Sequence, residues 1–550
     1  MPKPDFQEFD LWSLRDFDVS MTSDDRRETA IRLRELLGDY YVHLPQKVGA
    51  MAINPSRELE LLADDAPLYY NNLAFLNRLN AVITKLRDRH TALRMPEPLN
   101  RMIAFLPVVL ESCYEAGRRL LIVSRIAGEI PDDQLQVGVE VTHWNGTPVA
   151  QLINDLSWST PGSNPYARIA LAQRSLTLRA LGYMQMPPED WVTLSYISLK
   201  GERRHVSLNW RVAIAPEGGS TPGAVMSGTA MAAPLAAMLG LDEGTAIVNS
   251  GLKTLFSKPR RASVIRKSGQ RHGALLSEPL SGSAGLENLL SASTLTLDDG
   301  RNYGYLRLFS FSVQDVRRFA EDMAALLRQM PPAGLIIDVR GNPGGTIPAG
   351  EALLHLITDR AIEPTRNVFR ASRPLRAMAG TIPFFQRWQR SLDLVYETGQ
   401  DFSQGFELSD PADYAGLEHS YRGPVVVIID ALSYSTTDYF VAGFEDNRLG
   451  NILGLDPTTG AGGANVWSLS QISGFAAEAG LPEIPLLPVG MDCRVAVRRA
   501  LRAGPNRGLP LEGLGAMADQ RYFPTRRDIL GMNEDMLMAA VNLLQRPASV

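Results

Sequence analysis

The sequence is poor in the features that mark secreted, membrane-spanning and nucleic-acid-binding proteins. Its 550 residues include two cysteines, which cannot form a disulfide framework and which favour a reducing compartment. No apolar run reaches the length of a membrane span, and no apolar signal core follows the residues next to Met1. The net charge of −5 gives no basic excess for a nucleic-acid partner. We therefore expect a cytoplasmic protein that binds neither a membrane nor nucleic acid.

The signatures of metal and nucleotide sites are also missing from the sequence. No cluster of cysteine and histidine has the spacing of a metal site, and there is no glycine-rich loop of the Walker type. We therefore expect no metal and no other cofactor. What is present is ordinary globular material, with 45% hydrophobic and 21% charged residues. The chain is long enough for about three or four domains.

The order of helical and strand patterns predicts a multi-domain α/β protein with four parts. These are an N-terminal helical region at 1–98, a β-rich domain at 99–213, an insertion or linker at 214–297 and an α/β core with a C-terminal helix at 298–550. Apolar residues at helical spacing define the first part. Proline, glycine, serine and alanine dominate the third part, which is typical of a linker or loop.

The β-rich part resembles a PDZ domain. A strand pattern at 137–144 ends in Asn145-Gly146, which is a strong signal for a tight turn. Apolar residues at helical spacing then follow from Val149 to Leu156. A strand, a turn and a helix in this order within a small β-rich block are similar to the PDZ arrangement. An unspecified β-domain is the alternative.

Two buried strands in the last part of the chain lead into turns of unusual composition. The strand pattern at 334–340 runs into Gly341–Gly345, and the pattern at 425–429 leads through Asp430 into the polar turn 431–438. A helical pattern follows each turn, so we expect parallel strands with right-handed crossovers. Ligands of such sheets bind beyond the carboxyl ends of the strands. We therefore expect the two turns to face one another.

The polar turn has residues that suit a nucleophile. It contains Ser433, Ser435 and Thr436 between a buried strand and a helix. A hydroxyl in such a turn is accessible, and the free N–H groups of the following helix point at any anion that forms there. Helix capping by the same residue types is the alternative interpretation.

Several motifs occur in the order that is typical of the S41 serine peptidases. The chain resembles this family, which includes the C-terminal processing peptidases and the tricorn protease core. The motifs are Leu86–Thr91, Tyr303–Arg307, Asp338–Gly345, Ser433–Asp438 and Leu511–Asp519. The resemblance implies that 298–550 is an α/β catalytic core of S41 type, that the activity is peptide-bond hydrolysis, and that the substrate is a peptide or protein.

The resemblance places the nucleophile at Ser435, with Ser433 as the competing candidate. A serine hydroxyl needs a base that takes its proton in the transition state. The processing peptidases use a lysine that follows the serine, but no lysine follows Lys267 in this chain. A dyad of that kind is therefore excluded. The tricorn-like branch uses histidine and glutamate instead, and both are present.

The resemblance implies that His90 is the general base and that Glu512 is the carboxylate that orients its imidazole. The tricorn pattern has a serine just before its histidine, whereas this chain has Arg89. Asp88 is a reserve candidate for the orienting carboxylate. His355, which lies shortly after the glycine turn, is the alternative base.

The backbone N–H groups of Gly344, Gly345 and Thr436 are predicted to form the oxyanion hole. The sequence thus predicts a cytoplasmic serine peptidase, and it leaves a homo-oligomer open. Two alternatives remain. One is an inactive S41-type fold that serves as a binding or scaffold protein, and the other is an acyl hydrolase that uses the same triad on substrates other than peptides. The separation between the side chains of Ser435 and His90 discriminates the enzyme from the binding protein.

Overall fold

The computed structural model describes most of the chain. The described residues are 7–214, 239–256, 275–277, 280, 286–409, 414, 416–531 and 533–546. Much of the predicted insertion or linker at 214–297 lies outside them. No helix among these residues is long and apolar enough to cross a bilayer. Cys113 and Cys493 are buried free thiols.

The N-terminal part is helical, as its apolar spacing predicts. Its helices are α1 (Ser23–Tyr40), α2 (Leu44–Met51), α3 (Pro55–Asp64) and α4 (Asn72–Lys85). The first helix begins at a capping box in which the Thr22 side chain accepts from the Asp25 N–H and Asp25 accepts from the Thr22 N–H. Thr22 is therefore the N-cap, and Asp25 completes the box from inside the helix.

Two antiparallel sheets make up the β-rich part. One has the order β10 (Arg203–Asn209), β9 (Trp191–Ile197), β6 (Glu140–Trp144), β5 (Arg118–Ile126) and β4 (Val108–Glu115). The other has the order β1 (Gln7–Asp10), β11 (Arg211–Ile214), β3 (Met102–Phe105) and β8 (Leu178–Ala180). Two helices, α5 (Val149–Ser157) and α6 (Pro165–Ser175), belong to the same part of the chain. Because β1 pairs with β11, the N-terminal end of the described chain is part of this β-structure.

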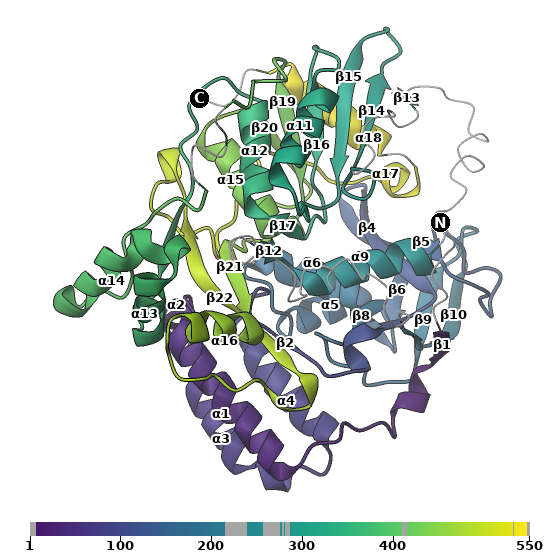
Figure 1. Cartoon of the computed structure of the whole chain (residues 1–550). Helices are drawn as coiled ribbons and strands as arrows, with labels where there is room; N and C mark the ends of the chain where they lie inside the picture. The colour runs from purple at the N-terminus through teal and green to yellow at the C-terminus, as the bar shows by residue number, and fades with distance from the viewer. Residues whose placement is uncertain are drawn as a thin grey trace.

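A seven-stranded sheet forms the centre of the last part, in the upper half of Figure 1. Its strands, in spatial order, are β13 (Leu275–Leu276), β14 (Leu290–Thr296), β15 (Asn302–Leu308), β16 (Leu335–Asp338), β19 (Val425–Ile429), β20 (Asn451–Gly454) and β23 (Gln520–Arg521). From β15 to β23 all neighbours are parallel. Because β14 already belongs to this sheet, the predicted boundary at residue 298 separates strands that the structure joins.

Helices cover this sheet on both faces, which explains why its central strands are continuous apolar runs. The helices α11 (Val316–Leu327), α12 (Ile347–Leu356) and α15 (Thr436–Asp446) pack against one another in sequence order, and α18 (Glu534–Leu544) packs on β16, β19 and β20. Every residue of β16 and β19 is buried. The structure is therefore α/β in this part, as the sequence predicts.

A further sheet joins the last part of the chain to the N-terminal helices. The long strand β22 (Asp492–Leu501) pairs with β2 (Ala92–Arg94), β18 (Arg366–Phe369) and β21 (Ala464–Ser468). In Figure 1 this strand extends from the upper sheet toward α1 and α4, and α13 (Arg373–Thr381) and α14 (Gln386–Thr398) project beside it. The segment that carries His90 lies between α4 and β2, so this pairing brings it to the core.

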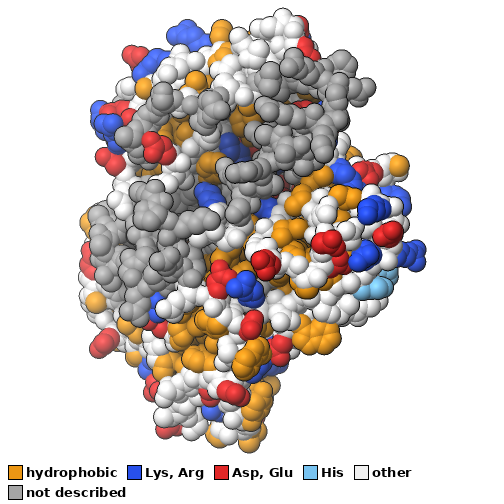
Figure 2. Space-filling model, turned by 90° about the vertical axis from the view of Figure 1, so that its right-hand side faces the viewer, with side chains coloured by type: hydrophobic (Ala, Val, Ile, Leu, Met, Phe, Trp, Pro, Cys, Tyr) orange, Lys and Arg blue, Asp and Glu red, His pale blue; other side chains and the backbone are white. Residues whose placement is uncertain are grey.

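Charged side chains of both signs are interspersed on the face of the molecule shown in Figure 2. Basic and acidic groups alternate there with apolar side chains. The described residues of this face therefore present a mixed surface, in keeping with the small net charge of −5.

A buried carboxylate fixes the end of β16. Asp338 is fully buried and accepts hydrogen bonds from Arg340 Nε (2.9 Å) and Arg340 Nη2 (2.7 Å). Arg307 Nη1 lies 3.6 Å from the same carboxylate. Burial alone would raise the pKa of Asp338, but the charges of Arg307 and Arg340 outweigh it and hold the pKa well below its usual value.

We expect Asp338→Asn to lower the free energy of unfolding by about 3 kcal/mol at neutral pH, because it leaves two partly buried guanidinium groups without their counter-charge. Urea denaturation at equilibrium measures this loss. Glu321→Gln is the control, since it breaks an exposed pair with Arg317 and should cost less than about 0.5 kcal/mol. Equal losses in the two variants would contradict the role of Asp338 as the counter-charge that holds Arg307 and Arg340 at the end of β16.

Candidate active site

The two turns that the sequence places at strand ends are in contact. In the parallel register, Asp338 of β16 stands opposite Ile428 of β19. Beyond these ends, the Gly341 N–H donates to Asp430 Oδ1 (2.8 Å), and the Tyr434 N–H donates to Asn342 O (3.0 Å). The glycine turn at 341–345 and the polar turn at 431–438, which we call the serine turn, therefore face one another, as predicted.

Ser435 immediately precedes α15 and has a strained backbone. Its dihedral angles are φ 65° and ψ −120°, in a region that residues with a side chain rarely occupy. Asp438 holds this conformation, because its Oδ2 accepts the Ser435 N–H at 2.7 Å. The same carboxylate accepts the N–H groups of Ala461 (3.1 Å) and Gly462 (3.0 Å). Burial raises the pKa of Asp438 to about 6, although these hydrogen bonds oppose the rise.

His90 contacts the hydroxyl of Ser435 directly. Its Nε2 lies 2.7 Å from Ser435 Oγ, and both residues are fully buried. Asp88 fixes the backbone beside the ring, since its Oδ1 accepts the His90 N–H at 2.8 Å. Burial, together with the positive charges of Arg494 and Arg89, lowers the pKa of His90 well below its usual value. The imidazole is therefore neutral at physiological pH and can accept a proton.

Glu512 is also fully buried, although its setting in the sequence resembles that of a solvated residue. Its Oε1 accepts a hydrogen bond from Lys47 Nζ at 2.6 Å, and Lys47 Nζ also donates to Arg87 O at 3.0 Å. The Oε2 atom lies 4.0 Å from His43 Nε2. Burial raises the pKa of Glu512 to about 7, with the Lys47 ammonium working against the rise.

The predicted contact between Glu512 and His90 is close but is not a direct hydrogen bond. An oxygen of Glu512, an oxygen of Asp88 and a ring nitrogen of His90 all lie within 4.8 Å of one another. Within the described residues, neither His90 Nδ1 nor Glu512 Oε2 has a hydrogen-bond partner. The structure therefore brings Glu512 close to the imidazole without a direct hydrogen bond between them.

The same three residues have the donor types of a cation site. Two features of the structure compete with such a use. Lys47 places a positive charge on Glu512 already, and both oxygens of Asp88 are occupied, one by the His90 N–H and the other by Thr91 Oγ1 (2.9 Å). Three of the carboxylate oxygens of this set therefore already have partners within the protein.

The predicted oxyanion-hole residues lie where the glycine turn contacts the serine turn. Thr436 Oγ1 donates to Gly345 O at 2.8 Å, which holds the two segments together. Gly344 and Gly345 both have positive φ, at 95° and 146°, and a side chain on Gly345 would collide with Phe311. The Gly344 N–H donates to Asn342 Oδ1 at 3.0 Å, so this donor has an acceptor of its own.

The competing nucleophile Ser433 and the alternative base His355 each have other partners in the structure. Ser433 Oγ lies 3.0 Å from both Val339 O and Asp430 Oδ1, so it ties the serine turn to the end of β16. His355 lies in α12, where its ring stacks on Tyr414 at 4.8 Å. The structure therefore places His90, and not His355, at the hydroxyl of Ser435.

The long-range partners of three residues of the site have no signal in the local sequence. Lys47 is separated from Glu512 by 465 positions, and nothing in α2 marks it as a partner. Asp438 fits the pattern of an acidic residue in the first turn of a helix, and that pattern does not show that it also holds Ala461 and Gly462. Arg89 donates to Asp242, which the sequence places in the expected linker.

Comparisons with known proteins agree with this architecture. Residues 302–476 match the family model of Peptidase family S41, and residues 103–222 match that of the PDZ domain. The predicted resemblance to S41 peptidases is thereby confirmed. A protein of Chlamydia trachomatis serovar D is 25% identical over 215 residues. The match covers 31% of this chain and 36% of that protein, so it spans well under half of the relative's length.

The solved structures that resemble almost the whole chain include two of mature CPAF. Mature CPAF has a TM-score of 0.66 with 18% identity, and the match covers 96% of this chain and 99% of CPAF. Mature CPAF complexed with lactacystin has a TM-score of 0.64 with 18% identity, covering 96% and 98% of the two chains. Likeness at this identity shows a shared multi-domain fold.

We expect Lys47→Met to lower the free energy of unfolding by about 3–5 kcal/mol at about pH 8, because it leaves the Glu512 carboxylate buried without its partner. The loss should be smaller at about pH 6, where Glu512, with a pKa of about 7, binds a proton in the folded state. Urea denaturation at the two pH values measures both. Lys85→Met is the control, since Lys85 pairs with Glu58 and its side chain is 45% exposed. A loss that is independent of pH would contradict the pairing.

Proposed function

We propose that this chain, which has an S41 peptidase domain at residues 302–476, is a serine peptidase that hydrolyses bonds in peptides or proteins. The observation that carries the proposal is the distance of 2.7 Å between His90 Nε2 and Ser435 Oγ. That distance is within hydrogen-bond reach, which is the geometry a nucleophile and its base require. It counts against the alternative of a binding protein without a base.

In the proposed reaction, Ser435 Oγ attacks the carbonyl carbon of the scissile bond while His90 Nε2 takes the hydroxyl proton. The resulting imidazolium then gives that proton to the leaving amine. Water attacks the acyl-enzyme in the second half of the reaction, with His90 again as the base. The strained backbone of Ser435 keeps its hydroxyl directed at the imidazole throughout.

Glu512 supplies negative charge next to the imidazolium that forms during each step. Its buried position makes that charge effective, because a low dielectric strengthens the attraction. Lys47 keeps the carboxylate in place through its hydrogen bond of 2.6 Å. We assign Lys47 the part of a positioning residue.

The tetrahedral oxyanion would be held by the N–H groups of Gly345 and Thr436. Thr436 is the first residue of α15, so its N–H lies at the positive end of the helix dipole. The Gly344 N–H would contribute a third hydrogen bond once it leaves Asn342 Oδ1 and donates to the oxyanion instead. Loss of one such donor costs about 3 kcal/mol of barrier.

A peptide substrate fits the edge of β17 (Gly344–Thr346), since an extended peptide can add a strand to such an edge. In this structure the short strand β12 (Leu239–Leu241) pairs antiparallel with β17, with Gly240 opposite Gly345. A bound substrate strand would take the place that β12 has here.

We expect a fluorophosphonate probe to label the wild-type chain and the Ser433→Ala variant, and not the Ser435→Ala variant. The Ser433 hydroxyl bonds to Val339 O and Asp430 and is not directed at the base. Its loss should therefore lower the free energy of unfolding by about 1 kcal/mol and leave the labelling unchanged. Mass spectrometry of the labelled peptide measures the site. Labelling that persists in Ser435→Ala would overturn the assignment of the nucleophile.

We expect kcat/KM for peptide cleavage to rise with pH through about 7, because Glu512 has a pKa of about 7 and must be ionised to stabilise the imidazolium. The lowered pKa of His90 keeps the base neutral over the same range. In Glu512→Gln the rate should fall and this rise should disappear. A rise of the same size and midpoint in the variant would show that another group titrates.

A further inference from the structure

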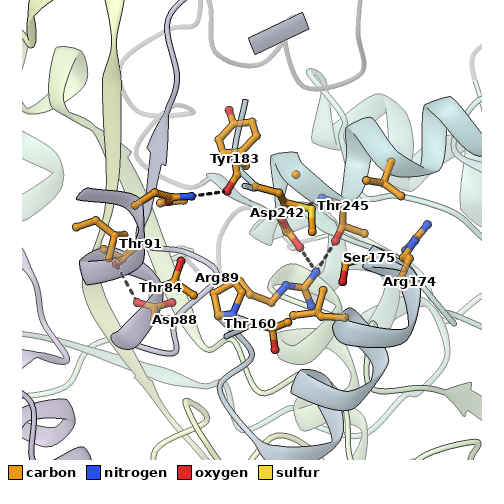
Figure 3. A pocket seen from close by; sticks show the side chains of 18 of the residues that line it. Thr84, Asp88, Arg89, Thr91, Thr160, Arg174, Ser175, Tyr183, Asp242 and Thr245 are labelled. Atoms are coloured by element: carbon orange, nitrogen blue, oxygen red, sulfur yellow. Dashed lines mark hydrogen bonds and ion pairs between the residues drawn. The ribbon is translucent and has the colours of Figure 1, made fainter. Parts of the chain in front are cut away.

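Three arginines from separate elements, of which Arg89 and Arg494 are buried and Arg174 is partly buried, have partners on one short segment. That segment is Asp242 with the helix α9 (Glu243–Leu255) that follows it. The pairs are Arg89 with Asp242 and Thr245, Arg174 of α6 with Asn249, and Arg494 of β22 with Glu243 at 3.4 Å. Figure 3 shows the Arg89 side chain directed at Asp242 and Thr245, with Arg174 on the far side of the same cavity.

A cavity lies between these residues. Without the segment at 242–249, which contributes Asp242, the side chains that line the cavity would have a net positive charge. Its wall then has Arg89, Arg174, Arg494 and the carboxylate of Asp88. The oxygens of Asp88 are already bonded to the His90 N–H and to Thr91 Oγ1. A buried guanidinium is costly without a counter-charge. The arginines around the Asp242 side chain therefore favour a carboxylate at that place.

Arg89 is held ready for such a ligand. Its guanidinium carbon lies 4.2 Å from the centre of the Tyr434 ring, and Tyr434 is the residue before Ser435. Arg89 is 4% exposed, and within the described residues its buried Nη1 has no hydrogen-bond partner. A carboxylate that approached both Nη atoms would satisfy this donor too, since a guanidinium can bind a carboxylate through two parallel hydrogen bonds.

The position of Asp242 lies next to the reacting serine. Asp242 continues the extended strand β12, with φ −85° and ψ 95°, and its N–H donates to Pro343 O at 2.9 Å. The other side of the same glycine segment contacts the serine turn, through Tyr434 N–H to Asn342 O and Thr436 Oγ1 to Gly345 O. A substrate strand bound along β17 in place of β12 would thus put one of its side chains where the Asp242 side chain is.

We propose that the cavity beside His90 is a subsite for an acidic side chain of the substrate, aspartate or glutamate, and that Arg89 binds its carboxylate. The cavity has a volume of about 90 Å³, and Ile83, Leu171 and Leu178 provide apolar walls for the methylene groups of such a side chain. The identity of the ligand as a substrate residue rests on the proposed peptidase function. The carboxylate preference itself rests on the arginines.

Binding to the full-length Ser435→Ala chain tests this subsite without turnover. The probes are neutral octapeptides that have a single glutamate at successive positions, each matched by a peptide with glutamine there. Fluorescence anisotropy measures Kd for each pair. At one position we expect the glutamate peptide to bind at least about tenfold more tightly. Adding Asp242→Asn should tighten its binding further, because asparagine still caps α9 but no longer competes for Arg89.

The charge of Arg89 is tested by adding Arg89→Gln together with Asp242→Asn. This double change neutralises both partners and so leaves no buried charge unpaired, and circular dichroism checks the fold. The preference for glutamate should fall below about twofold, whereas Arg118→Gln, which changes an arginine whose side chain is 77% exposed, should leave it intact. Equal binding of glutamate and glutamine peptides at every position, or no binding of any peptide even with Asp242→Asn, overturns the subsite.

The two proposals fail separately in this design. If the wild-type chain cleaves peptides but the glutamate and glutamine peptides bind equally, the peptidase proposal stands and the subsite proposal fails. A Ser435→Ala chain that prefers glutamate through Arg89, paired with a wild type that cleaves none of the peptides, would keep the subsite and remove the peptidase.

Discussion

The parallel pairing of β16 with β19 is the constraint on which the site depends. Both strands are buried along their whole length, so their register cannot slip without moving apolar side chains out of the core. The pairing sets Asp338 opposite Ile428, and the two following turns then meet. Ser435 acquires its strained backbone within that contact, where Asp438 holds it. The position of the hydroxyl is thus a consequence of how the sheet is built.

Buried ion pairs also hold the segments around Ser435 in place. Lys47 with Glu512 and Arg89 with Asp242 are ion pairs whose side chains are at most 7% exposed. Such pairs contribute little net stability, because desolvation offsets most of the attraction, but a broken pair is costly. Each pair also joins segments that are far apart along the chain. The N-terminal helices and the segment at 242–255 therefore belong to the site as much as the S41 domain does.

Much of the fold follows from local patterns, whereas the long-range contacts of the site do not. The β-branched run at 425–429 and the apolar spacing after Val149 predict β19 and α5 because they record burial directly. The approach of His90 to Ser435 was predictable from motif resemblance alone. Composition around Glu512 indicates a solvated carboxylate, and the partner that allows its burial lies 465 positions away. The positive φ of Ser435 is equally hidden, since no glycine marks it.

The strand β22 has a practical consequence for work with parts of this protein. It pairs with β2, just after His90, and with β18 and β21 of the core, so a single strand connects the segment of the proposed base to the part of the chain that holds the proposed nucleophile. The span matched by the S41 model, 302–476, includes the serine but neither His90 nor Glu512. Under the proposed mechanism, two fragments divided between His90 and Ser435 would each be inactive, and their reassembly through β22 would report on the association of any proteins fused to them.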